Sequence, residues 1–157
     1  MTDLDAIMAL ERGEGFESYV GRSTRGEHEV MLESPRYAYF LGRDGEGRAV
    51  AFAILRDLDD PYGNLYLKRI AVAAPGQGRG TAFLRRVVDW AFAETETYRF
   101  YLDCLDDNAR AQRAYAKLGF SRDGTLRGAY LGPDGQRRDL YLMALTRPEW
   151  AARNANL

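Results

Sequence analysis

The residues most suited to chemistry form a glycine-rich turn, GQGRGTA, at positions 76–82. It follows an apolar, β-rich run at 65–73 and precedes an amphipathic run at 81–94, so it is predicted to join a strand to the start of a helix. Unpaired N–H groups and the helix dipole make such a turn an anion site, and Arg79 adds positive charge. The turn is therefore predicted to bind phosphate groups.

Three kinds of phosphate site fit a turn of this composition. A nucleotide P-loop ends in lysine followed by serine or threonine, but here Thr81 follows Gly80 without a lysine. A dinucleotide site requires G-x-G-x-x-G, and the last glycine here has a different spacing. The predicted hairpin before the strand also disfavours a dinucleotide fold. The third kind, a site for the pyrophosphate of coenzyme A, stays open.

Two segments resemble the GNAT superfamily of N-acetyltransferases. Residues 77–82, QGRGTA, are similar to the family signature Q/R-x-x-G-x-G/A. Residues 102–120 are similar to a second family pattern, N-x-x-A-x-x-x-Y-x-x-x-G-F, at Asn108, Ala111, Tyr115, Gly119 and Phe120. The tail, 124–150, looks like the closing hairpin of the branch that acetylates ribosomal-protein N-termini. Members usually have a strand before the first helix, and none is predicted here.

The resemblance, which covers about residues 3–150, implies transfer of an acetyl group from acetyl-CoA to a primary amine. The acceptor would be a small molecule or a protein N-terminus, and no metal is implied. Three alternatives stay open: a transferase using a longer acyl-CoA, a CoA-binding sensor without catalysis, and a nucleotide-binding domain. The last is disfavoured by the missing lysine.

The resemblance also implies a donor site. The pyrophosphate would be held by the amides of Gln77, Gly78, Arg79, Gly80, Thr81 and Ala82. The pantetheine arm would pair, as an added strand does, with the strand edge at Ile70, Ala71 and Val72. Asn108 would hydrogen-bond the same arm. Tyr115 would be the general acid for the leaving sulfur; outside this motif, a core aromatic residue would be the simpler interpretation.

An amine must lose a proton before it attacks a thioester, because its ammonium form has a pKa of about 8 to 10. The resemblance implies Asp103 as the base, directly or through water, because the resembling branch has a carboxylate at this place; strand alternation also puts it on the other side from Leu102 and Cys104. A charge at an exposed strand end is the alternative. Three glutamates of the first helix could attract a cationic amine, but a solvated helix face is favoured: Glu11, Glu14 and Glu17.

Two further residues have chemistry that the motifs do not use. His28 is the only histidine and lies in the polar run GEHEV, so a solvent-facing helix position is favoured over a base. Cys104 is predicted to be buried, and no histidine lies near it in sequence to lower its pKa.

The elements that must position these residues follow from hydrophobic periodicity. Helices are predicted at 3–20, 24–33, 81–94 and 109–118, with Thr2 and Asn108 as N-caps and Gly119 after the last. Gly13 and Gly15 interrupt the first helix, so two separate pieces are the alternative there. Strands are predicted at 37–43, 49–56, 65–73, 98–105, 125–131 and 137–145. Two hairpins and one strand–helix–strand crossover predict an α/β (α+β) fold: a mixed, mostly antiparallel sheet with helices on both faces.

The composition limits the classes of protein to which this chain can belong. The 157 residues, 46% of them hydrophobic, predict a single domain over 1–157. The net charge of -1 with dispersed basic residues disfavours a nucleic-acid partner. One cysteine suits a reducing cytoplasm, and no apolar run suggests a membrane span. The expected partners are acetyl-CoA and an unidentified amine, with a homodimer left open.

Overall fold

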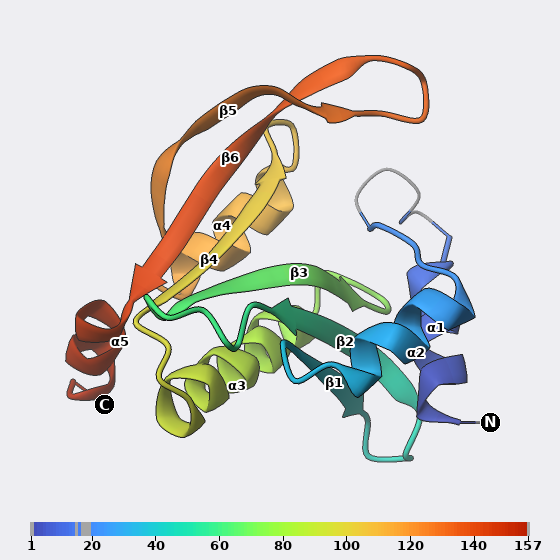
Figure 1. Cartoon of the computed structure of the whole chain (residues 1–157), viewed down its shortest axis with the longest axis horizontal. Coiled ribbons are helices and arrows are strands. Elements are labelled where there is room, and N and C mark those ends of the chain that lie inside the picture. The colour runs from blue at the N-terminus through green and yellow to red at the C-terminus, as the bar shows by residue number, and fades with distance from the viewer. Residues whose placement is uncertain (1, 15, 17–19, 157) are drawn as a thin grey trace.

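The computed structural model describes residues 2–14, 16 and 20–156 (Figure 1). Its helices are α1 (Asp3–Glu11), α2 (Arg25–Glu33), α3 (Arg79–Glu94), α4 (Ala109–Lys117) and α5 (Arg147–Asn154). Its strands are β1 (Tyr37–Arg43), β2 (Ala49–Arg56), β3 (Asn64–Val72), β4 (Arg99–Leu105), β5 (Ser121–Leu131) and β6 (Arg137–Thr146). Among these described residues, no helix is both long enough and apolar enough to cross a membrane.

The strands form a six-stranded sheet in the order β1-β2-β3-β4-β6-β5. Neighbouring strands are antiparallel except β3 and β4, which α3 joins in a parallel crossover. The predicted mixed, mostly antiparallel fold with one crossover is confirmed. Strand β1 forms one edge of this sheet, and β5 forms the other.

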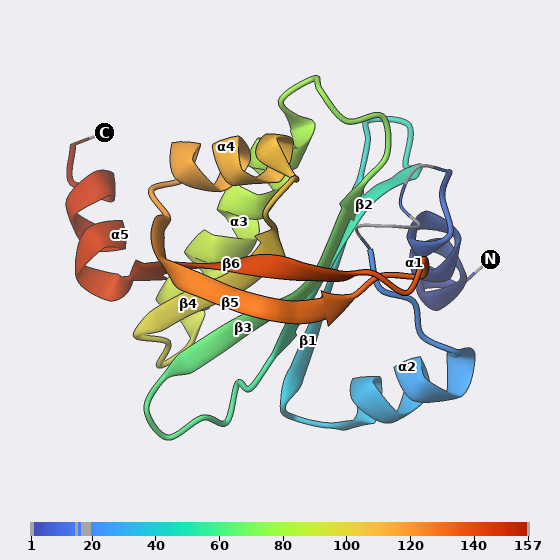
Figure 2. The ribbon, with the colours of Figure 1, turned by 90° about the horizontal axis from the view of Figure 1, so that it is seen from above.

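Helices cover both faces of the sheet, as predicted (Figure 2). On one face, α3 and α4 contribute Leu84, Val88, Phe92 and Tyr115 to the larger buried core, where they meet Phe100 of β4. On the other face, α1 packs on β2 and β3 and α2 on β1, over a smaller core. The smaller core includes Ile7, Phe52, Ile54 and Ala71.

An extra residue in β3 changes which face its side chains reach. Ile54 of β2 pairs with Arg69 and Leu55 with Leu67, so Lys68 is unmatched. Such a bulge reverses the alternation of side chains beyond it. Leu67 lies in the larger core, yet Arg69, two residues later, faces α1. The sequence alternation alone would have placed both on one face.

Two helix predictions need correction. The first helix ends at Glu11, just before Gly13, which was expected to interrupt it, and among the residues predicted to be helical after it the described ones (12–14, 16 and 20) are not helical, while 15 and 17–19 lie outside the described residues. The C-terminal helix α5 was not predicted. Its signal is readable in retrospect: Thr146 and Glu149 form a capping box, and a proline lies in the first turn.

Candidate active site

Strands β3 and β4 separate after a short paired segment. They pair only at Asn64–Arg99, Leu65–Phe100 and Tyr66–Tyr101. Beyond Tyr66, β3 continues to Val72 while β4 runs on to Leu105, and the two ribbons diverge (Figure 1). Backbone groups on the facing edges of both strands are therefore not used by this strand pair.

A cleft of about 1720 Å³ opens at this separation. It is lined by the diverging strands, the glycine-rich turn, α4 and part of the α1–α2 region. A volume above the usual range for small-ligand sites is compatible with an elongated ligand. The splay also opens the sheet from one face to the other, so residues from both faces border one cavity.

The glycine-rich turn has the backbone geometry of an anion site. Gly78 is the N-cap of α3 with φ of 73° and provides no side-chain hydrogen bond. The first N–H groups of α3 therefore lack an intrahelical acceptor. A Cβ on Gly76 or Gly78 would meet no atom within 4 Å, and one on Gly80 would make an ordinary van der Waals contact with Val72 at 3.4 Å. The space above this turn is therefore open, and the positive φ angles of Gly76 and Gly78 are what favour glycine there.

The structure brings most of the predicted donor-site residues to the cleft. Its lining includes Ile70, Ala71, Val72, Gly78, Gly80, Thr81 and Asn108. Gln77, Arg79 and Ala82 lie in the same turn but are exposed outside the lining. Asn108 caps α4 as predicted, because its Oδ1 accepts a hydrogen bond from the N–H of Ala111 at 3.2 Å. Gly119 ends that helix with φ of 94°.

Tyr115 lies at the inner wall of the cleft. Its side chain is 8% exposed and packs in the larger core near Phe120. Within the described residues, its hydroxyl makes no hydrogen bond to another side chain. Burial, with smaller contributions from Cys104 and Asp103, raises the pKa of the hydroxyl, which keeps it protonated. Tyr115 is thus a protonated hydroxyl beside the cavity.

Asp103 also lines the cleft, but from the opposite face of the sheet. Its Oδ2 accepts a hydrogen bond from Tyr66 Oη at 2.9 Å. Tyr66 stacks on Tyr101 with ring centroids 5.1 Å apart, and the Arg56 guanidinium lies 4.8 Å above its ring. Burial and the Asp103 carboxylate raise the pKa of Tyr66, so this hydroxyl remains a donor. The hydrogen bond from Tyr66 occupies Oδ2 of Asp103, so Oδ1 can accept a hydrogen bond from another partner.

Sequence reasoning missed Tyr66. Its alternation with buried Leu65 and Leu67 shows that it faces the other side of β3. That it meets Asp103 depends on the β3–β4 register, which the sequence does not encode locally. Cys104 is buried as predicted, and burial, then Asp103, raises the pKa of its thiol to about 11.

Two predictions about the α1–α2 region were wrong. His28 was expected to face solvent, and Glu11 to lie on a solvated helix face, but each is 0% exposed. Glu14 is exposed as expected, and Glu17 lies outside the described residues. The error arose because the groups that pair with Glu11 and His28 in the interior, Arg69 and Tyr39, belong to β3 and β1 and give no signal within either helix.

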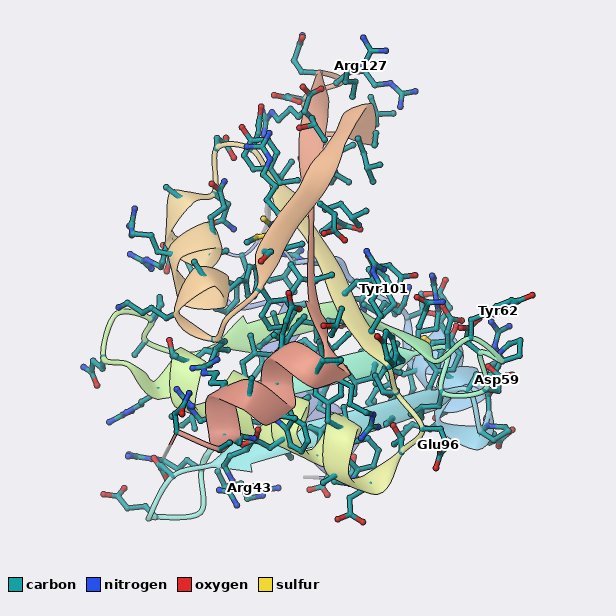
Figure 3. All side chains as sticks on the ribbon, turned by 90° about the vertical axis from the view of Figure 1, so that its left-hand side faces the viewer. Arg43, Asp59, Tyr62, Glu96, Tyr101 and Arg127 are labelled. Atoms are coloured by element: carbon teal, nitrogen blue, oxygen red, sulfur yellow. The ribbon has the colours of Figure 1, made fainter. Side chains whose placement is uncertain are left out.

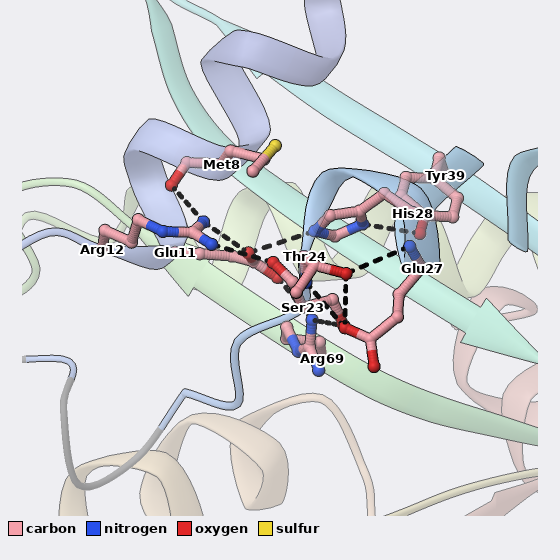
Figure 4. A network of polar contacts seen from close by, with 9 residues as sticks. All are labelled: Met8, Glu11, Arg12, Ser23, Thr24, Glu27, His28, Tyr39 and Arg69. Atoms are coloured by element: carbon pink, nitrogen blue, oxygen red, sulfur yellow. Dashed lines mark hydrogen bonds and ion pairs between the residues drawn. The ribbon is translucent and has the colours of Figure 1, made fainter. Parts of the chain in front are cut away.

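Glu11 and His28 belong to a buried ionic cluster with Ser23, Tyr39 and Arg69 (Figure 4). Glu11 Oε1 accepts a hydrogen bond from Arg69 Nη1. Glu11 Oε2 lies 3.1 Å from His28 Nε2 and 3.1 Å from Nη1 of the neighbouring Arg12. The cluster ties α1 and α2 to β1 and β3.

The imidazole of His28 joins a carboxylate to a phenol. Its Nδ1 lies 2.8 Å from Tyr39 Oη. Burial raises the pKa of Tyr39 to about 12, so its hydroxyl keeps its proton. A neutral imidazole with its proton on Nε2 would accept from Tyr39 and donate to Glu11. Tyr39 therefore stays a hydrogen-bond donor, and the contacts of the cluster connect elements of the fold to one another.

Curated relatives share part of their length with this chain. A mycothiol acetyltransferase of Kineococcus radiotolerans is 33% identical over 107 residues, which is 67% of this chain and 34% of the relative. An uncharacterised N-acetyltransferase of Mycobacterium bovis is 35% identical over 94 residues, 60% of this chain and 59% of the relative. The matches thus span about one third to three fifths of those proteins.

Solved structures match over nearly the whole chain. The spermidine N-acetyltransferase of Vibrio cholerae, solved with CoA and spermine, gives a TM-score of 0.82 at 17% identity over 96% of this chain and 95% of that chain. The ribosomal-protein-S18-alanine N-acetyltransferase of Escherichia coli gives 0.73 at 27% identity, covering 93% and 88%. The family model described as "Acetyltransferase (GNAT) family" matches residues 4–120. This match, on a fold that holds both motifs against one cleft, shows that the chain belongs to the GNAT family of acetyltransferases.

Proposed function

We propose that this protein is an N-acetyltransferase that moves an acetyl group from acetyl-CoA to a primary amine. The observation that carries the proposal is the splay of β3 from β4, which borders one cavity with a phosphate-binding turn, a protonated tyrosine and a carboxylate. The family and the CoA-bound neighbour support acetyl-CoA as the donor substrate.

The donor would lie along the unpaired edge of β3. Backbone groups of Ile70, Ala71 and Val72 would pair with the amides of the pantetheine arm, as a neighbouring strand does. The N–H groups that begin α3 would hold the pyrophosphate, because they converge there without partners. Asn108 uses its Oδ1 as the cap of α4, so its side-chain NH₂ would be the group that reaches the arm.

Tyr115 and Asp103 would act from opposite sides of the bound thioester. Tyr115 would give its proton to the departing thiolate, a role supported by its high pKa. Asp103, held by Tyr66, would bind the incoming ammonium through Oδ1 and direct its proton to water. This role suits a carboxylate better than direct proton abstraction, because an ordinary carboxylate is a weak base for an alkyl ammonium.

The lining of the cavity carries both signs of charge near Asp103. Asp103 and Glu14 are carboxylates of this lining, Lys68 is a cation of it, and Arg69 is already paired with Glu11. The site therefore supports a primary amine as the acceptor, and the panel of acceptors below distinguishes a protein N-terminus from a small amine. We place the reaction in the cytoplasm, in keeping with the single buried cysteine.

An acceptor panel tests the proposal. Acetyl-CoA is offered with a short peptide bearing a free N-terminus, an amino acid, spermidine and an aminoglycoside, and the released thiol and the acetylated product are both measured. Thiol release and product mass should agree for at least one of these acceptors. A parallel series with hexanoyl-CoA tests the longer donor. CoA binding with no turnover of any acceptor would instead indicate a sensor and contradict the proposed activity.

A further inference from the structure

Helix α4 presents three cations to the cleft that have no acidic partner. Arg110, Arg113 and Lys117 all line the cavity, and their spacing places them on one face of the helix over about 10 Å. Within the described residues, none of them forms an ion pair. We call these three residues the basic face of α4.

The basic face differs from other cations that border the cavity. Arg43 pairs with Asp3, Arg48 with Asp44, and Arg69 with Glu11. These arginines are already neutralised by the protein. Asp107 is the carboxylate nearest in sequence on the cleft lining, yet it lies beyond ion-pair distance of the basic face. Lys68 of β3 is a further lining cation without an ion pair among the described residues, so three of the four unpaired lining cations lie on α4.

The basic face lies on the helix next to the one that the glycine-rich turn begins. Helices α3 and α4 contact each other on one face of the sheet (Figure 2). The glycine-rich turn and the basic face border the same cavity. A ligand whose pyrophosphate rests on the turn would bring its adjacent groups toward α4.

We propose that the basic face of α4 binds the 3′-phosphate of coenzyme A and makes the protein select CoA over its 3′-dephospho form. This inference rests on the proposed function, because it takes CoA as the donor. The ribose that follows the pyrophosphate carries a phosphate monoester with about −1.5 to −2 charges at neutral pH. Arginine forks and a lysine ammonium are the side chains that bind such a group.

Binding measurements without turnover test this inference. Isothermal titration calorimetry compares CoA with 3′-dephospho-CoA for the native chain and for the triple variant Arg110→Gln, Arg113→Gln, Lys117→Gln. The native chain should bind CoA about tenfold or more tightly than 3′-dephospho-CoA, and added salt should reduce the difference. The triple variant should lose most of the preference, while its affinity for 3′-dephospho-CoA should change less than about threefold.

A control with the same charge separates local contact from net charge. Arg22, Arg86 and Arg127 are exposed and lie outside the cleft lining, with Arg127 at the far end of the β5–β6 hairpin (Figure 3). The variant Arg22→Gln, Arg86→Gln, Arg127→Gln should keep the preference for CoA. Circular dichroism and thermal unfolding test whether both variants fold.

The outcomes distinguish this inference from the proposed function. Equal affinities in the native chain, or a full preference retained by the α4 variant, would overturn the role of the basic face while leaving the acetyltransferase proposal intact. A preference lost equally in the control variant would also overturn it, since only net charge would then matter. Failure of native protein to bind either nucleotide would overturn both proposals.

Discussion

The buried ionic cluster and the cleft both reach β3, and their polar groups are used differently. In the cluster, Glu11 has Arg69, Arg12 and His28 as partners, and His28 also contacts Tyr39. In the cleft, Asp103 has Tyr66 as a partner on Oδ2, and the hydroxyl of Tyr115 has none among the described side chains. Apart from Arg69 Nε, which has no partner among the described residues, the cluster's groups are directed at one another, whereas those of the cleft retain hydrogen-bonding capacity for a ligand.

Ionisable groups that hold the fold together differ here from those that border the cavity. The single histidine, which has the side chain best suited to base catalysis at neutral pH, is in the structural cluster. The carboxylate of Asp103 and the phenol of Tyr115 have less suitable ordinary pKa values but border the cavity. Access and unused hydrogen-bonding capacity are therefore better guides here than residue type.

The largest effect is expected from removing the hydroxyl of Tyr115. Tyr115→Phe should lower kcat by about 10²–10⁴, the usual contribution of a general acid, with little loss of CoA affinity. Tyr141→Phe is the matched control, because Tyr141 packs against the same core without lining the cleft. Steady-state kinetics and calorimetry measure the two effects. A Tyr115 variant with kcat within twofold of native would remove this residue from the chemistry.

Breaking the buried ionic cluster should act on stability instead. Glu11→Ala leaves Arg69 and His28 buried without a carboxylate, and breaking a buried ion pair costs about 3–5 kcal/mol. Urea unfolding should show this loss in the free energy of unfolding. Glu14→Ala, at an exposed position in the same region, should change it by less than about 0.5 kcal/mol. Equal losses in both variants would show that the cluster contributes no special stability.

A smaller effect is expected at Asp103. Asp103→Asn should reduce kcat/KM by about tenfold to a hundredfold, the worth of one charge-assisted hydrogen bond. If the carboxylate attracts the ammonium, the loss appears mainly in KM; if it takes the proton, kcat falls at neutral pH and high pH restores only part. A variant with unchanged kcat and KM over pH 6 to pH 10 would contradict both roles.

Tyr66 is expected to act only through Asp103. Tyr66→Phe removes the hydrogen bond at 2.9 Å and should lower kcat/KM by about tenfold or less. In the Asp103→Asn background the same change should have almost no further effect, because the two residues work as one unit. A double-mutant cycle measures this coupling. Additive losses would mean that Tyr66 acts independently of the carboxylate.

The smallest effect on activity is expected at Cys104. Its thiol, with a pKa raised to about 11, has roughly a hundredfold less thiolate at neutral pH than one with a pKa near 9. Iodoacetamide should therefore modify the folded protein slowly, and Cys104→Ala should keep kcat within about twofold. Because the pKa of this thiol is raised in the folded state, its ionisation leaves the free energy of unfolding unchanged well below pH 9 and lowers it as the pH rises toward 11. Fast alkylation of folded protein at neutral pH would contradict this picture.

The fold was largely predictable because its signals are local. The glycine-rich turn, the Asn108 cap and the two hairpins follow from residue types within a few positions of one another. The wrong assignments lie where local signals were weak. Residues 3–20 carried an apolar pattern that continued past the true helix end, and α5 is a short helix marked mainly by its cap.

The two family motifs, the order of the elements as far as β6, and Asp103 and Tyr115 as residues to test could all be predicted from the amino-acid sequence. That these two side chains, which come from opposite faces of the sheet, border the same cleft depends on the folded structure. The folded structure also decided that Glu11 and His28, which are 17 positions apart, meet Arg69 beneath α1. The physical reason is register: the separation of β3 from β4 and the bulge at Lys68 set which side chains meet. Both depend on contacts between strands that are distant in sequence.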